Sequence, residues 1–166
     1  MKELSSIRTV NLVAFLLTCS MIVMAAYLQF SKGLEPCPLC IVQRFIAVLL
    51  CVVFLVGVLH RSTTWWVRFH GFLITVIAGS GVAAAGRQVY LQTLPPNQLP
   101  PCAPNLSYIL ERLSWSDSIK FLVRGSADCA QIKWTLFNLS IPEWTIGLFA
   151  LFTLVGLWEM FKKKHG

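Results

Sequence analysis

The stretch TVNLVAFLLTCSMIVMAAYLQFS, residues 9–31, contains no charged residue and is apolar almost throughout. A helix needs about 20 such residues to cross the hydrocarbon core of a bilayer. The segment therefore predicts a transmembrane helix over about residues 10–30. A cleaved signal peptide is the alternative, but its apolar core is usually shorter, about 7–15 residues, and it ends in a small-x-small site, of which Ala25-Ala26 is a weak version.

Three more apolar segments follow and predict helices over about residues 39–59, 69–90 and 144–161. The chain has 166 residues, of which 56% are hydrophobic and 13% charged, and its mean hydropathy is +0.68. A soluble domain is nearer a quarter charged. We therefore expect a single all-α integral membrane domain, a bundle of four transmembrane helices with loops over about residues 31–38 and 91–143.

The formal net charge of +7 raises the question of nucleic-acid binding. That function requires a basic stripe interleaved with aromatic residues, whereas the charges here stand between and beside the apolar segments. Four spans place both termini on one side, and Lys and Arg are densest near the short ends on that side. The positive-inside rule then predicts cytoplasmic termini and two extracytoplasmic loops.

Six cysteines are many for this length, and four of them lie outside the apolar segments. Disulfides persist in oxidising compartments, which for a bacterium means the periplasm. The sequence therefore favours a multi-pass protein of a bacterial inner membrane, with both loops in the periplasm. The remaining two, Cys19 and Cys51, fall within the spans, and we interpret them as packing residues.

The long loop begins with LPPNQLPPCAP, residues 94–104, which holds five of the eight prolines and predicts an extended segment. Apolar residues at helical spacing follow it. They predict a short amphipathic helix, which either lies on the membrane surface or packs on the end of the bundle; these residues are Leu106, Ile109, Leu110 and Leu113.

Cys37-Pro38-Leu39-Cys40 stands at the predicted start of the second helix. Two thiols at this spacing can close a disulfide, and a helix N-terminus favours a reactive thiolate. Haem attachment needs His after the second cysteine, where Ile41 stands, and a zinc site needs a second C-x-x-C or paired histidines. We therefore predict no metal and a redox-active pair, with a purely structural disulfide as the alternative.

Cys102 and Cys129 form a second pair, which the topology places on the same side of the membrane as the first. Cys102 lies in the extended proline-rich segment, where another protein can reach it, and thiol exchange needs access. Two pairs in one aqueous space allow a relay between them. A disulfide that merely staples the loop is the alternative.

Arg44 follows Cys40 by four residues, so the two side chains share a helix face. Its charge would stabilise a Cys40 thiolate or bind a ligand carbonyl, although an interfacial arginine that snorkels is the other interpretation. Arg87 and Gln88, at the matching end of the third helix, are weaker candidates for the same pocket.

The electron acceptor is inferred from compartment rather than from a motif. The sequence contains no credible flavin, nicotinamide or haem motif. Regeneration of a strongly oxidising periplasmic thiol oxidase must end in a stronger oxidant. A quinone is the acceptor readily available inside a bilayer, and the sequence does not separate ubiquinone from menaquinone.

Five motifs in order resemble the bacterial disulfide-bond-formation protein B (DsbB) family over nearly the whole chain. These motifs are EPCPLCIVQR at 35–44, AGRQVYLQ at 85–92, PPCAP at 100–104, ADCAQIKW at 127–134 and IPEWTIGLF at 141–149. The resemblance implies an enzyme that reoxidises a soluble thioredoxin-fold partner of the DsbA type and passes the electrons to a quinone.

The resemblance also implies a role for each site residue. Cys102 would form the mixed disulfide with the partner, and Cys129 would be its loop mate and pass electrons to the first pair. Cys37 would receive them, Cys40 would contact the quinone as a thiolate, and Arg44 would help bind the quinone. Two alternatives stay open at this point: a non-enzymatic tetraspan protein with a stapled outer loop, and a quinone reductase running in the opposite direction.

Overall fold

The computed structural model describes residues 2–33, 36–60, 64–101, 116, 120, 123–132 and 134–162. Within this part of the chain, four long helices are each long and apolar enough to cross a membrane. They are α1 (Lys2–Lys32), α2 (Pro38–Leu59), α3 (Thr64–Thr93) and α6 (Ile141–Phe161). The predicted all-α bundle of four membrane-spanning helices is confirmed.

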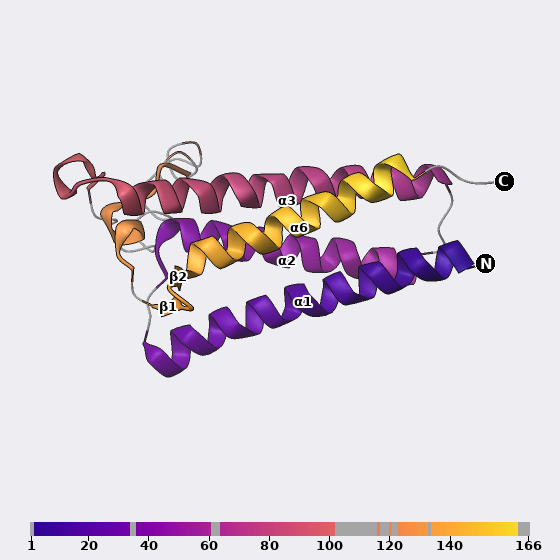
Figure 1. Ribbon diagram of the computed structural model, residues 1–166, viewed down its shortest axis with the longest axis horizontal. Helices are drawn as coiled ribbons and strands as arrows, with labels where there is room; N and C mark the ends of the chain where they lie inside the picture. The colour runs from indigo at the N-terminus through magenta and orange to yellow at the C-terminus, as the bar shows by residue number, and fades with distance from the viewer. Residues whose placement is uncertain are drawn as a thin grey trace.

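The helices lie side by side as an elongated bundle (Figure 1). The first residues of α1 and the last residues of α6 are at one end, and the short extramembrane elements are at the other. We call these the terminal end and the thiol end. Toward the thiol end α1 diverges from α2 and α3 in this view.

Three helices begin earlier or end later than the apolar segments indicated. The helix α3 has 30 residues, against the 22 expected over 69–90. At 1.5 Å per residue it is about 45 Å long, more than the roughly 30 Å of the hydrocarbon core. Hydropathy marks the lipid-buried part of a helix, and the polar turns at its ends continue into the headgroup layers.

The core is built from interlocking aromatic and small residues. The rings of Phe54 and Phe152 meet edge to face with centroids 5.2 Å apart. Near the terminal end, a Cβ atom on Gly156 would come within 2.6 Å of the hydroxyl of Thr75 and 2.8 Å of the carbonyl of Gly71. Since lipid supplies no hydrophobic drive between helices, such close backbone approach is how α3 and α6 associate.

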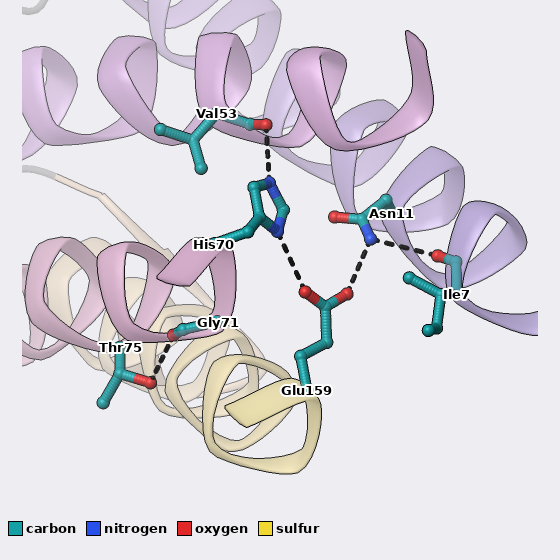
Figure 2. A network of polar contacts seen from close by, with 7 residues as sticks. All are labelled: Ile7, Asn11, Val53, His70, Gly71, Thr75 and Glu159. Atoms are coloured by element: carbon teal, nitrogen blue, oxygen red, sulfur yellow. Dashed lines mark hydrogen bonds and ion pairs between the residues drawn. The ribbon is translucent and has the colours of Figure 1, made fainter. Parts of the chain in front are cut away.

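A closed polar network joins all four helices near the terminal end (Figure 2). Glu159 of α6 accepts a hydrogen bond from Asn11 of α1 at 2.6 Å and pairs with His70 of α3 at 2.9 Å. The other ring nitrogen of His70 is 2.9 Å from the carbonyl oxygen of Val53 on α2. Asn11 and Glu159 are fully buried.

The described part of the long loop contains two 3₁₀ turns, η1 (Pro96–Gln98) and η2 (Ala127–Ala130), and a small hairpin of β1 (Thr135–Leu136) and β2 (Leu139–Ser140). Phe137 and Asn138 both have positive φ, as a two-residue hairpin turn requires. Because glycine is the usual residue there, the sequence carried little sign of this turn. The amphipathic helix predicted over 106–113 lies outside the described residues.

Candidate functional site

The C-x-x-C pair sits at the first turn of α2. Cys37 is the N-cap, its sulfur accepts from the amide of Cys40, and Pro38 occupies the first turn, where a missing N–H costs nothing. The Sγ atoms of Cys37 and Cys40 are 2.9 Å apart. Both thiols therefore stand at the positive end of the helix dipole, which stabilises a thiolate.

Cys129 of η2 packs against this pair. Its side chain is fully buried, and its thiol hydrogen-bonds with that of Cys37. Gly125 allows the loop to come this close: its φ is +76°, and a Cβ there would lie 2.8 Å from Leu91 and 2.9 Å from Leu39. Cys37 thus touches both Cys40 and Cys129, one from each predicted pair.

The contact between Cys37 and Cys129 shifts the pKa values of their thiols in opposite directions. Donation from Cys37, aided by hydrogen bonds from the Ser126 and Leu39 backbone, lowers the pKa of Cys129 to about 6. The same hydrogen bond, with burial, raises the pKa of Cys37 far above its usual range. In the reduced cluster Cys37 therefore keeps its proton, which can be donated to Cys129 or to Cys40, and Cys129 is the more acidic thiol of the Cys37–Cys129 contact.

A chain of side-chain amides leads from Cys40 into the bundle. The amide nitrogen of Gln88 donates to Cys40 Sγ at 3.4 Å. Gln43 donates to Gln88 Oε1 at 2.7 Å, and the hydroxyl of Thr145 donates to Gln43 Oε1 at 2.8 Å. These residues come from α2, α3 and α6, and together they fix the orientation of the Gln88 amide toward the sulfur.

Gln43 and Thr145 were not among the predicted site residues. Gln43 stands three residues after Cys40, on the same face of α2, and it is a buried amide in an apolar span. That combination is a signal the sequence did contain. Thr145 carried no comparable signal, because a threonine in the first turns of a helix is common.

A cavity of about 400 Å³ opens beside Cys37 and Cys40. Its volume is within the usual range for a small-molecule site, about 300–1,000 Å³. Polar groups converge at the end near the thiols, and the rest of the wall is mostly apolar. The apolar wall comes from α1, α2 and α6 and includes Leu17, Met21, Met24, Leu28, Ala47 and Leu148.

Arg44 lines the cavity and spans from α2 to α1. Its guanidinium donates to the carbonyl oxygen of Ala25 at 2.8 Å and to the side-chain oxygen of Gln29. The side chain therefore holds the wall formed by α1 in place, with its charge at the cavity. Gln88 of α3 lines the same cavity as Arg44.

Arg87 does not line this cavity. Its guanidinium stacks 5.5 Å from the ring centroid of Tyr90, and it borders a separate hollow with Lys120 and Arg124. Successive residues on a helix point about 100° apart, so Gln88 and Arg87 cannot both face the thiols. The expected place of Arg87 in the thiol pocket is not found.

The remaining predicted cysteines are Cys102, in the long loop, and Cys19 and Cys51, in the spans. Cys102 lies outside the described residues. Cys19 and Cys51, interpreted as packing residues, come from α1 and α2 and bring their Sγ atoms within 3.3 Å of each other. Their contact adds to the α1–α2 interface below the cavity.

The comparisons with known proteins show the family of the chain. Residues 7–159 match the family described as Disulfide bond formation protein DsbB. The chain is 37% identical to Disulfide bond formation protein B of Nitrosococcus oceani, over 93% of this chain and 92% of that protein. It is 42% identical to Disulfide bond formation protein B 1 of Pseudomonas aeruginosa, over 90% and 91% of the two chains. This multi-pass membrane protein therefore belongs to the DsbB family of disulfide bond formation proteins.

Proposed function

We propose that this protein reoxidises a periplasmic thioredoxin-fold oxidase of the DsbA type and passes the electrons to a membrane quinone. The observation that carries the proposal is the contact of Cys37 with both Cys40 and Cys129, next to an apolar cavity. Thiol–disulfide exchange needs a thiolate beside the sulfur that it attacks. Cys129 meets that requirement toward Cys37.

The relay step follows from this geometry. With Cys37 and Cys40 joined as a disulfide, the Cys129 thiolate attacks the sulfur of Cys37. A Cys37–Cys129 bond forms, the Cys37–Cys40 bond breaks, and its electron pair leaves on Cys40. The leaving thiolate forms at the N-terminus of α2, where Gln88 donates a hydrogen bond to it. Cys40 is the better leaving group because these groups stabilise its charge.

The cavity suits a quinone by its size and its chemistry. It has a volume of about 400 Å³, is mostly apolar, and carries a guanidinium and side-chain amides near Cys40. Arg44 would bind a carbonyl oxygen, and Gln88 and Gln43 would orient the head group against Cys40.

Attack of Cys102 on Cys129 would break the Cys37–Cys129 bond, re-form the Cys102–Cys129 disulfide and release Cys37 as a thiol. A quinone bound in the cavity would supply the two-electron oxidant that restores the Cys37–Cys40 disulfide, and it would leave as the quinol.

The partner side of the relay belongs to Cys102, by the family resemblance. Reduced partner would attack Cys102 of a Cys102–Cys129 disulfide, and Cys129 would leave as a thiolate, which the hydrogen bonds from Ser126 and from the Leu39 backbone stabilise. The distribution of Lys and Arg supports cytoplasmic termini, with the thiol end in the periplasm and the protein in the bacterial inner membrane.

The test uses purified protein in detergent or nanodiscs, a reduced thioredoxin-fold oxidase and a soluble ubiquinone or menaquinone analogue. Quinone reduction is followed by absorbance, and thiol loss in the partner is followed by alkylation. We expect Cys37→Ala and Cys40→Ser to abolish partner-dependent quinone reduction while the protein still inserts and folds. Cys51→Ser is the matched control, since it removes a thiol that contacts neither pair, and it retains activity.

Quinone reduction at the wild-type rate in Cys37→Ala or Cys40→Ser would refute the relay. A stapled scaffold without enzymatic activity would leave the quinone oxidised in every variant, wild type included. To identify the partner bond, the Cys129→Ser variant is mixed with the oxidised oxidase. The free Cys102 thiol should attack the disulfide of the oxidase and form a mixed disulfide, visible by mass spectrometry of the linked peptides.

A further inference from the structure

A second hollow lies away from the thiol cavity and carries strong positive charge. It has a volume of about 570 Å³ and is lined by Arg87, Lys120, Val123 and Arg124. Three of these four residues are cations. Arg87 comes from α3, and the others come from the segment of the long loop just before η2. The hollow therefore lies where α3 meets the loop that carries Cys129.

Placing Arg87 and Arg124 at one hollow has an electrostatic cost. Like charges repel one another, and near a low-dielectric membrane the repulsion is stronger than in water. Among the described residues, neither Arg87 nor Arg124 forms an ion pair with a carboxylate. An anion in the hollow would reverse the sign of the interaction and hold the loop against α3.

The position of Arg87 along α3 indicates where that anion comes from. The span Trp65–Thr93 has its middle at Gly79, and Arg87 lies eight residues further along. At 1.5 Å per residue this is about 12 Å from the middle, close to the edge of a hydrocarbon core about 30 Å thick. An arginine there reaches the level of lipid phosphates by snorkelling.

The residues around these cations are also of the kinds found at the level of the lipid headgroups. Tyr90, which stacks on Arg87, is 53% exposed, and Val123 is 58% exposed. A tyrosine at this level belongs to the aromatic belt of an interface, and an exposed valine beside it suits acyl chains. A soluble acidic protein approaching from the aqueous side would meet Lys120 and Arg124 more readily than the half-buried Arg87.

We propose that Arg87, Lys120 and Arg124 form a binding site for a phosphate group, supplied by the headgroup of an anionic phospholipid of the outer leaflet. Two guanidinium groups can each give paired hydrogen bonds to phosphate oxygens, and the lysine adds a point charge. The bound headgroup joins the loop to α3 and so helps position η2, which begins three residues after Arg124.

The experiment compares wild type with the double variant Arg87→Gln/Arg124→Gln in nanodiscs of phosphatidylcholine with 0–30% phosphatidylglycerol. Native mass spectrometry after release counts the phosphatidylglycerol molecules retained. We expect wild type to keep one more such lipid than the double variant, with affinity about fivefold lower for each arginine removed. The Arg87→Lys variant keeps the charge and should lose less.

Arg68→Gln is the matched control, because Arg68 is an exposed arginine of the same helix near the opposite edge of the core; it should leave this lipid bound. Circular dichroism checks that each variant folds. Inorganic phosphate added to lipid-free protein in neutral detergent identifies the source: protection from unfolding that equals that of phosphatidylglycerol would mean free phosphate and overturn the lipid assignment. Equal lipid retention by wild type and the double variant would overturn the site itself.

Discussion

The bundle contains two buried polar clusters, one at each end. One is enclosed by packed helices, and the other borders a cavity. At the terminal end, Glu159 with His70 and Asn11 form a network closed on all sides by packed helices. At the thiol end, Gln88 and Gln43 line a cavity and direct an amide toward Cys40. The first cluster pairs Glu159 with two donors among packed helices and leaves Asn11 Oδ1 without a hydrogen-bond partner, whereas the second lines a cavity with room for a ligand.

Small residues explain the difference. A Cβ on Gly57 would lie 2.6 Å from the ring of His70 and 2.9 Å from Asn11 Oδ1, so α2 lies directly against the terminal network and leaves no space for another molecule. At the thiol end a cavity of about 400 Å³ remains between side chains of α1, α2 and α6. We infer that the terminal cluster holds the helices in register, while the thiol cluster performs the chemistry.

The largest expected effect comes from breaking the terminal cluster. Glu159→Ala leaves the hydrogen-bond donors of Asn11 and His70 unpaired among apolar helices. Removing one partner of a buried pair typically costs about 3–5 kcal/mol, measured here by unfolding in a mixed-detergent titration. Glu143→Ala, which removes a carboxylate at the exposed start of α6, should cost much less.

The comparison also predicts that the Glu159→Ala protein which remains folded still reduces quinone at the wild-type rate per folded molecule. A loss of electron transfer in folded protein, with stability unchanged, would mean that the terminal cluster takes part in the chemistry.

The next effect concerns the thiolate at the thiol end. In fully reduced protein we expect Cys129 to be alkylated by iodoacetamide with a midpoint near pH 6, because its pKa is lowered to about 6. The thiolate is present above that pH and lost below it, so the rate should fall about tenfold from pH 7 to pH 5. Peptide mass spectrometry separates Cys129 from the other cysteines.

The Cys37→Ala variant removes the hydrogen-bond donor that contributes most to the lowered pKa of Cys129. Its Cys129 midpoint should move upward, toward the ordinary thiol value of about 8.5. An unchanged midpoint in this variant would show that the Cys37–Cys129 contact does not control the ionisation.

The smallest effect tests the wall of the cavity. Arg44→Met removes the hydrogen bonds to Ala25 and Gln29 and the charge beside the cavity, while it keeps much of the apolar side chain. We expect the KM for the quinone analogue to rise about tenfold, as for the loss of one charged hydrogen bond, with kcat less affected. A kcat that falls with KM unchanged would place Arg44 in the electron-transfer step instead.

The sequence by itself determined the number of helices, their apolar cores and the start of α2. These features depend on local causes: a run of about 20 apolar residues must cross the bilayer as a helix, and Pro38 is well suited to a first turn. The reactive C-x-x-C at a helix N-terminus was predictable for the same reason, since Cys37, Cys40 and the helix dipole are neighbours along the chain.

The tertiary structure alone decided which side chains from distant segments meet. The contact of Cys129 with Cys37 depends on the positive φ of Gly125, and the place of Gln43 beside Gln88 depends on the rotation of α2 against α3. The same rotation turns Arg87 away from the cavity. Hydropathy cannot predict a rotation angle, because every face of a membrane helix is apolar and the packing of residues such as Gly71 and Gly156 selects the face that is buried.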